Sequence, residues 1–210
     1  MRTLACLLAL AVADDLFDSG LTALAQDELA PIFNGKDLTG WEAVAGSGDC
    51  WEVRDGKIVC KGGKGGWLCT KEEYGDFEIE VEYNCPKDGN SGVFIRAPRE
   101  GHTSKIGMEI QLLDDDAKIH EKIKPYQHTG SIYGVVAPSK PAQKPAGEWN
   151  TIRIRCKGDQ VTITINGEKV VDADMGAHEE LKGRPRKGYI GLQNHGSGLE
   201  FRSVKLKKLD

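Results

Sequence analysis

The sequence lacks the features by which several classes of protein are recognised. It has no excess of basic residues, since 28 Lys and Arg stand against 32 Asp and Glu, so its charge gives no indication of nucleic-acid binding. It has no apolar run long enough to span a bilayer, and no internal repeat. No two cysteines have the CxxC spacing of zinc ribbons and thioredoxin-like proteins. The chain is therefore expected to bind no nucleic acid and to have no transmembrane segment.

Familiar ligand motifs are also missing. The glycine-rich segment 62–66 lacks the GxxxxGK[ST] spacing of a phosphate loop, and a flexible hairpin loop explains it better. Residues Asp114–Asp116 lack the alternating ligands of an EF-hand, which favours a solvated acidic turn. No Ser-His-Asp or Cys-His arrangement can be identified. Beyond Cys6 the cysteines are odd in number, and we expect structural thiols, with a Cys60–Cys69 disulfide left open.

The N-terminus has the pattern of a signal peptide. Met1-Arg2 gives a positive start, Leu4–Ala13 is apolar, and Ala23–Ala25 has the small-x-small pattern of a cleavage site. Three aspartates within the leader depart from that pattern. We predict a signal peptide over residues 1–25, a domain over residues 30–209, and a periplasmic or secreted protein of undetermined oligomeric state.

What the chain does have is glycine, 26 residues of 210, scattered between short alternating segments. Residues 77–83 alternate apolar with Glu, as a strand with one buried face requires. Asp55-Gly56 separates two such segments, which is the signal for a two-residue hairpin. Asn166-Gly167 separates two others, with Glu168 lengthening that loop slightly. Convincing helices are lacking, so the pattern predicts an all-β sandwich of two antiparallel sheets. The predicted core comprises Val93, Ile95, Ile110, Leu112, Ile152, Ile154 and Leu192.

The segment 114–148 interrupts this alternation. It contains four prolines between Asp114 and Glu148, and connections of this length are uncommon unless they are functional or disordered. Tyr126, His128 and Tyr133 lie within it. Two interpretations stay open at this point, a tolerated surface insertion and a wall or lid beside a site.

Strand parity points to a polar sheet surface in three segments, residues 90–96, 107–112 and 190–195. In each, aliphatic residues alternate with hydrogen-bonding residues, so the two kinds fall on opposite faces. If the strands are neighbours, their polar residues line one surface that could hold a sugar, although outward strand faces are ordinarily polar. The residues are Arg96, Glu109, Gln111, Gln193 and His195.

These segments, with others in order along the chain, resemble the 3-keto-disaccharide hydrolase family, which also includes 3-keto-glucoside lyase and hydratase domains. The resemblance covers roughly residues 31 to 209 and is carried by motifs that are specific only together. They are IFNGKDLTGW (32–41), YGDFE (74–78), NSGVFIR (90–96), residues 107–114, TGSIY (129–133), EWN (148–150), GLQNHG (191–196) and EFR (200–202).

The resemblance implies a concanavalin A-like jelly roll whose sugar site lies on the concave sheet, and an oxidised glycoside as its carbohydrate partner. A ketone at C3 acidifies the hydrogen on C2, so elimination of the C1 substituent followed by hydration gives net hydrolysis. Glu109 or His195 could be the base, and Arg96 or a divalent metal could stabilise the enolate. No cofactor is certain; a metal would have Glu109, Asp114 and His195 as candidate ligands. The expected substrate-binding residues are Asn90, Gln111, Gln193, Tyr133, Trp67 and His128.

Other function classes stay open. A retaining glycosidase needs two carboxylates about 5–5.5 Å apart. The same-face neighbour of Glu109 on its strand is Gln111, which disfavours that mechanism unless a bulge brings Asp114 round. A non-catalytic carbohydrate-binding module would present exposed aromatic platforms, and Trp67 is the best candidate for one. A structural or protein-interaction sandwich is the third class.

Overall fold

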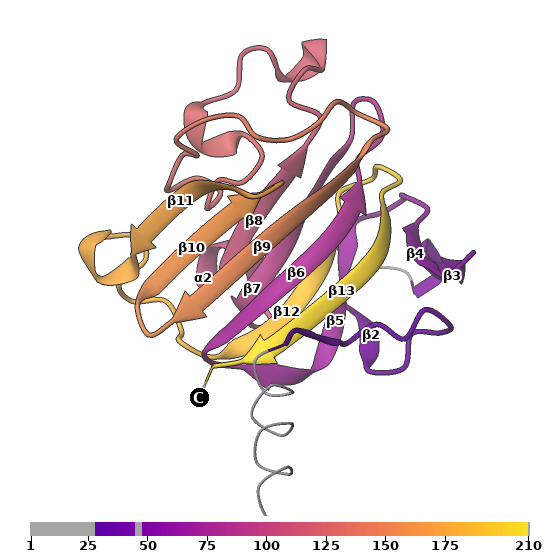
Figure 1. Ribbon diagram of the computed structural model, residues 1–210, viewed down its shortest axis with the longest axis horizontal. Coiled ribbons are helices and arrows are strands. Elements are labelled where there is room, and N and C mark those ends of the chain that lie inside the picture. Colours follow the sequence, from indigo (N-terminus) through magenta and orange to yellow (C-terminus); the bar gives the residue numbers. More distant parts are fainter. Residues whose placement is uncertain (1–27, 45–47, 210) are drawn as a thin grey trace, which may run out of the picture.

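The computed structural model describes residues 28–44 and 48–209. The predicted signal peptide therefore lies outside the described residues. Within them, nearly all regular structure is antiparallel β, arranged as two facing sheets (Figure 1), and the predicted two-sheet sandwich is confirmed. No helix in the described part of the chain is long and apolar enough to cross a membrane.

The larger sheet has eight strands and the smaller has five. The order of the larger sheet is β11 (Glu168–Asp174), β10 (Gln160–Ile165), β9 (Trp149–Lys157), β6 (Phe77–Asn84), β13 (Glu200–Lys208), β4 (Lys57–Cys60) and β3 (Trp51–Arg54), with β1 (Ala30–Pro31) also paired to β13. The order of the smaller sheet is β2 (Trp41–Val44), β5 (Gly66–Tyr74), β12 (Gly188–Asn194), β7 (Asn90–Ala97) and β8 (Met108–Leu113). The helical turns are α2 (Thr103–Ile106), η1 (Gly48–Cys50), η2 (Lys118–His120), η3 (Pro125–Gln127) and η4 (Met175–Ala177).

The core lies between the sheets. All seven predicted core residues are 0% exposed, because alternate residues of each strand point to the same side. Burying such aliphatic side chains contributes roughly 1.5–3 kcal/mol each. The five described cysteines are buried free thiols. Cys60 packs in the core and Cys69 in a smaller cluster with Trp67 and Phe94, so no Cys60–Cys69 disulfide is present.

Both predicted hairpins form, and Glu168, which was predicted to lengthen the second loop, is instead the first residue of β11. Asp55-Gly56 joins β3 to β4 with φ values of 50° and 73°, and Asn166-Gly167 joins β10 to β11 with 50° and 87°. Two consecutive positive φ angles define the turn whose twist matches the flanking strands. Asn and Asp tolerate this conformation better than other side chains, and glycine meets no steric penalty there.

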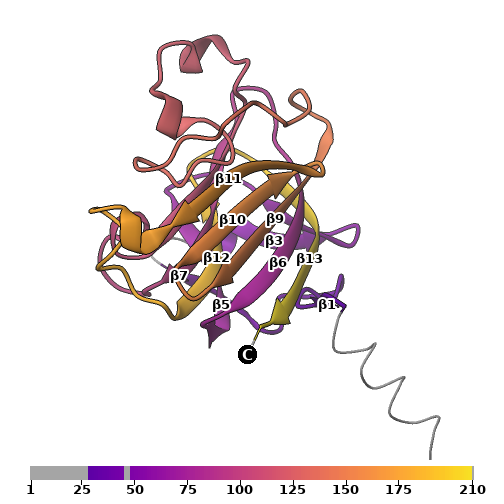
Figure 2. The same cartoon turned by 60° about the vertical axis from the view of Figure 1, so that its left-hand side comes forward.

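The long connection between β8 and β9 stands above one end of the sandwich (Figure 2). Part of it runs beside β8, because Gly130 N donates to Gln111 O at 2.9 Å and Tyr133 N donates to Glu109 O at 2.9 Å. Ile132 pairs with Ile110 in this short extension and is fully buried. The segment is therefore partly an additional edge of the smaller sheet, close to the strand that carries Glu109.

Candidate functional site

We call the outer face of the five-stranded sheet the polar face. It carries most of the residues that strand alternation predicted to share one polar surface. Strand order brings β12, β7 and β8 side by side. Gly92 on β7 is in register with Gln111 on β8, and Gln193 on β12 is in register with Trp67 on β5. The structure thus places Glu109, Gln111 and Gln193 together on this face, as predicted.

Glu109 is held across the middle strand by Gln193. The Gln193 Nε2 donates to Glu109 Oε1 at 2.8 Å, although β7 lies between their strands. The bond spans β7 because Gly92 has no side chain there. A Cβ at position 92 would lie 2.9 Å from both Cγ and Oε1 of Glu109, closer than real Cβ contacts allow. A side chain at position 92 would therefore displace the Glu109 carboxyl group from its present position beside Gln193.

A second glycine shapes the neighbouring part of the face. The indole of Trp67 lies over Gly191, where a Cβ would come within 2.0 Å of its Cε3 atom. Phe94 meets the indole edge to face, with ring centroids 5.4 Å apart. Trp67 is consequently only 2% exposed. The expectation that it is an exposed stacking platform is wrong, because the ring fills the space that Gly191 leaves.

Several polar atoms on this face make no hydrogen bond with any described residue. They are Trp67 Nε1, Gln111 Oε1, Ser131 Oγ and Gln193 Oε1. Buried polar groups are ordinarily satisfied, and amide and hydroxyl groups suit the alternating donors and acceptors of a sugar. Asn90 is also placed here, accepting from Gln111 Nε2 at 3.0 Å. Sequence analysis missed Ser131, whose position beside Gln111 follows from the edge pairing of the long connection.

Tyr133 lies beside Glu109 through the same edge pairing. Its backbone N–H donates to the Glu109 carbonyl, and its hydroxyl accepts from Gln127 Nε2 at 2.9 Å. Because Ile132 points into the core, Tyr133 lies on the other side of the extension. The structure therefore brings this predicted binding residue to the site, although nothing in its sequence neighbourhood indicated the pairing.

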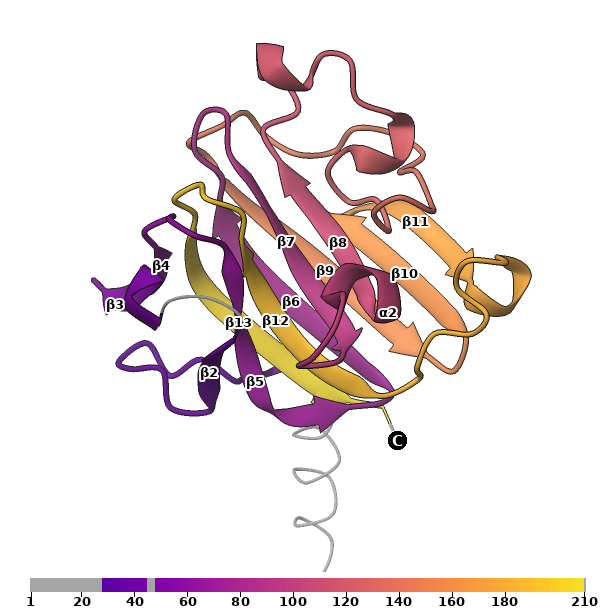
Figure 3. The same cartoon turned by 180° about the vertical axis from the view of Figure 1, so that it is seen from behind.

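A pocket of about 300 Å³ opens next to the Glu109–Gln193 pair. The residues that line it come from β5, β7, the end of β12 and the loop that carries α2. They are Gly66, Trp67, Phe94, Gly101, His102, Thr103, Ser104, Gln193, Asn194 and His195. That loop lies over the outer face of the sheet (Figure 3), and the volume is at the lower end of the range for small-molecule sites.

Glu109 is the titratable group most perturbed by this environment. Its side chain is 6% exposed, and burial raises the pKa of the carboxyl group from 4.5 to about 7, although the hydrogen bond from Gln193 opposes the rise. Oε1 accepts from Gln193, and no described residue donates to Oε2. A carboxyl group with a pKa near neutrality can both accept and return a proton at physiological pH.

No hydrogen bond or ion pair joins Glu109 to His195 in the described part of the chain. Gln193 is the hydrogen-bond partner of the carboxylate. His195 follows the last residue of β12 and is exposed, at the rim of the same pocket. The strand parity that placed it ends with β12 at Asn194, so the imidazole is not held over the sheet as Glu109 is.

Arg96 is the clearest correction, since the structure removes it from the polar face. Between β7 and β12, Phe94 pairs with Gly191 and Ala97 pairs with Tyr189, so two residues of β7 oppose one residue of β12. This is a β-bulge, and it reverses the parity of the residues at the end of β7. Arg96 adopts a φ of 47°, and its side chain is 0% exposed.

The guanidinium group of Arg96 instead ties together two turns at the end of the sandwich. Nε donates to Gly75 O at 3.0 Å, Nη1 to Gly158 O at 2.9 Å, and Nη2 to Asp76 Oδ1 at 3.0 Å. Asp76 also accepts from Gly158 N. A buried charge satisfied on three nitrogens in this way has a structural role.

The candidate metal ligands do not converge. Among the described residues there is no group of three or more His, Cys, Asp or Glu side chains arranged to hold a metal ion. Asp114 accepts from the backbone N–H of Asp88 at 2.8 Å, in the turn after β8. The residues present therefore do not fit a metal site built from Glu109, Asp114 and His195.

His128 lies in a different pocket. Its Nδ1 is 3.1 Å from Asp115 Oδ1, and both line a space of about 410 Å³ bounded by Pro125, Pro138 and Pro141. Burial raises the pKa of Asp115, while Thr129 and His128 lower it. The expectation that His128 joins the other binding residues is wrong, because the long connection directs it into this separate pocket.

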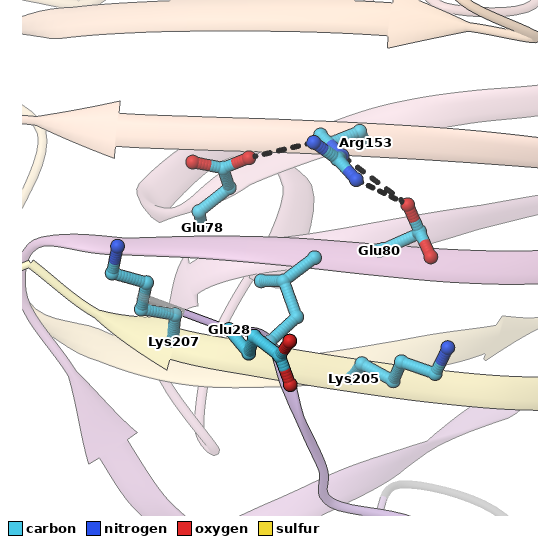
Figure 4. A pocket seen from close by; sticks show the side chains of 7 residues that line it. Glu28, Glu78, Glu80, Arg153, Lys205 and Lys207 are labelled. Atoms are coloured by element: carbon cyan, nitrogen blue, oxygen red, sulfur yellow. Dashed lines mark hydrogen bonds and ion pairs between the residues drawn. The ribbon is translucent and has the colours of Figure 1, made fainter. Parts of the chain in front are cut away.

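A further groove crosses the outer face of the eight-stranded sheet (Figure 4). Arg153 on β9 pairs with Glu80 at 2.7 Å and with Glu78 at 3.3 Å, both on β6. Lys205 and Lys207 on β13 continue the alternation of charge on the other side of β6. These cross-strand pairs stabilise a solvated surface, as the sequence predicted for the glutamates.

Comparison with known proteins agrees with this arrangement. A family model described as the 3-keto-alpha-glucoside-1,2-lyase-like domain matches residues 28–207. A 3-keto-disaccharide hydrolase of Bacteroides thetaiotaomicron is 27% identical, over 88% of this chain and 79% of the relative. A crystal structure from Parabacteroides distasonis, assigned as a glycosyl hydrolase, is 29% identical with a TM-score of 0.78, covering 87% of this chain and all of that one. The carbohydrate-binding module CBM66 of Bacillus subtilis, 16% identical with a TM-score of 0.58, shares the fold over 80% of this chain and 96% of its own.

Fold and comparisons together define a carbohydrate-active jelly-roll sandwich, with a buried carboxyl group of raised pKa on one sheet face. The chain belongs to the 3-keto-alpha-glucoside-1,2-lyase-like domain family, whose model matches nearly all of its described residues. At the level of the family it is a glycoside-acting enzyme.

Proposed function

We propose that this protein cleaves 3-keto-glycosides by eliminating the C1 substituent and then adding water. The observation that carries the proposal is the Glu109 carboxyl group, buried on the polar face with a pKa raised to about 7 and held by Gln193 beside the pocket. The name of the Bacteroides relative supports the substrate class.

In this reaction Glu109 is the base. A ketone at C3 lowers the pKa of the C2 hydrogen, and Oε2, to which no described residue donates, would accept that proton. The amide of Gln193 fixes the carboxylate and has a second N–H that can donate to the substrate. Positioned proton transfer of this kind typically contributes about 10²–10⁴-fold to the rate.

Direct acid–base hydrolysis fits the pocket less well. That mechanism requires a second carboxylate about 5–9.5 Å from the first, as nucleophile or base. Glu109 is bonded to Gln193, which lines the pocket, and no second Asp or Glu is among the lining residues or bonded to them. An elimination needs only one carboxylate, because the ketone stabilises the negative charge that develops when C2 loses its proton.

The decisive experiment uses p-nitrophenyl 3-keto-glucoside and the corresponding unoxidised glucoside. We expect release of p-nitrophenol from the first and not from the second. Glu109→Gln should lower turnover by about 10²–10⁴-fold with the fold retained, whereas Glu148→Gln, at an exposed position before β9, should have no effect. Binding of the ketone without turnover would instead indicate a non-catalytic carbohydrate-binding module.

We also propose that the protein is exported, with cleavage after Ala25. The support is the pattern of charge, apolar run and small residues in the sequence. Mass spectrometry of periplasmic or secreted protein should find Gln26 at the N-terminus. An intact Met1 on the mature protein would refute export by this route.

A further inference from the structure

His102 faces the same pocket as Gln193 and His195, from a different part of the chain. It lies in the loop between β7 and β8, just before α2, and its ring makes no hydrogen bond or ion pair with any described residue. No motif in the sequence pointed to it. The pocket thus has one titratable residue on the covering loop, His102, and another at the end of β12, His195.

Local structure leaves the imidazole free for a ligand. His102 occupies the N-cap position of α2, where Ser, Thr, Asp or Asn would ordinarily bond the first turn, yet its side chain makes no capping bond. Its backbone carbonyl accepts from Lys105 N and Ile106 N at 3.0 and 2.9 Å. A residue that is a poor cap but occupies the cap position is a departure from local preference, which is expected at functional sites.

The loop is also held in place over the sheet. Arg184 Nη1 donates to Ser104 O at 3.0 Å and to Gly107 O at 2.7 Å, which fixes both ends of α2. Gly107 packs so closely on Ala97 that a Cβ would approach within 2.5 Å of the Ala97 Cα. His102 is therefore carried on a clamped turn, as precise positioning of a reacting group requires.

We propose that His102 is the general acid that protonates the departing glycosidic oxygen, an inference that rests on the proposed cleavage of 3-keto-glycosides. Elimination needs a base at C2 and an acid at the oxygen on C1. An acid and a base on two walls of one pocket can act on these two adjacent atoms. Gln193, which holds Glu109, lines the pocket from the sheet, and His102 lines it from the overlying loop.

The proton balance closes over one turnover. Glu109 takes the C2 proton, the C2–H electron pair becomes the C1=C2 bond, and the C1–O bond breaks with its electrons on the leaving oxygen. The imidazolium of His102 gives that oxygen its proton and becomes neutral. In the hydration, neutral His102 takes a proton from water as the water oxygen bonds to C1, and Glu109 returns its proton to C2. Both groups regain their starting states.

The test is the dependence of the rate on the leaving group. An alcohol needs protonation to depart, whereas p-nitrophenolate does not. We expect His102→Gln to lower turnover of a 3-keto-disaccharide by about 10²–10⁴-fold, and turnover of p-nitrophenyl 3-keto-glucoside by less than about tenfold. His178→Gln, at a position outside the pocket, is the matched control, and unfolding midpoints of both variants should match the wild type.

Equal losses on the two substrates, or no loss on either, would overturn the assignment of His102. A leaving-group dependence produced by His195→Gln instead would transfer the role to that residue and equally refute the inference. If the wild-type protein turns over neither 3-keto substrate, the proposed function fails and this inference fails with it. The wild-type assay separates that outcome from the others.

Discussion

Glu109→Gln should make the protein more stable at alkaline pH while removing its activity. In the folded protein the carboxyl group has a pKa of about 7, against 4.5 ordinarily. Below about pH 4.5 the group is protonated in both folded and unfolded chains and contributes nothing. As pH rises from there to about 7, the unfolded chain releases the proton while the folded chain keeps it, so unfolding is increasingly favoured.

The magnitude comes from the size of the shift. A rise from 4.5 to about 7, at about 1.4 kcal/mol per pKa unit, means that ionised Glu109 destabilises the folded state by about 3 kcal/mol above pH 8. Glutamine is neutral at every pH, has nearly the same shape, and keeps an oxygen that can accept from Gln193. The variant should therefore gain about 3 kcal/mol at pH 8.5 and almost nothing at pH 4.5.

Urea unfolding of both proteins at pH 4.5, 6, 7 and 8.5 measures this difference directly. Taking the difference between the two proteins removes the contributions of all other titrating groups that do not contact position 109. The exposed control Glu148→Gln should change stability by less than about 0.5 kcal/mol throughout. A difference between Glu109→Gln and wild type that stays constant with pH would show that Glu109 titrates normally, and would refute the burial argument and the base assigned from it.

Two further predictions concern the scaffold of the site. Gly92→Ala should break the Glu109–Gln193 bond, because its Cβ would lie 2.9 Å from the carboxylate. Turnover should fall by at least about tenfold, with a stability cost of about 1–3 kcal/mol. The control is Gly183→Ala, where nothing lies within 4 Å of the added Cβ, and an unchanged rate in Gly92→Ala would contradict the geometry. Arg96→Met should cost about 3–5 kcal/mol in urea unfolding, because two turn carbonyls lose their Arg96 donors and Asp76 keeps only the bond from Gly158 N. A loss below about 1 kcal/mol would show that this buried network is dispensable.

Much of the fold and part of the site can be predicted from the sequence because side-chain alternation is a local property. Val93, Ile110 and Leu192 are buried as alternation requires, and Glu109, Gln111 and Gln193 fall on the opposite face. The Asp-Gly and Asn-Gly turns form where they were predicted, since their conformation depends on two residues only.

Which residues become partners on that face depends on strand order and on bulges. Both are set by the pairing of strands that are far apart in the sequence. Arg96 lies inside the sandwich because one additional residue in β7 reverses the parity of the strand. Alternation in β7 alone gives no sign of this, since the bulge is defined only against β12.

Tertiary structure alone also decided what surrounds Glu109. Its bond to Gln193 requires β12 and β8 to flank β7, with glycine at position 92 between them, and its raised pKa is a consequence of burial in that arrangement. His102 lines the pocket from the α2 loop, which Arg184 on a distant segment holds by two hydrogen bonds. The sequence by itself determined which faces its strands would bury and expose. Which residues meet on the exposed face was decided by contacts between distant segments, because a pKa or a hydrogen bond depends on neighbours in space and not on neighbours along the chain.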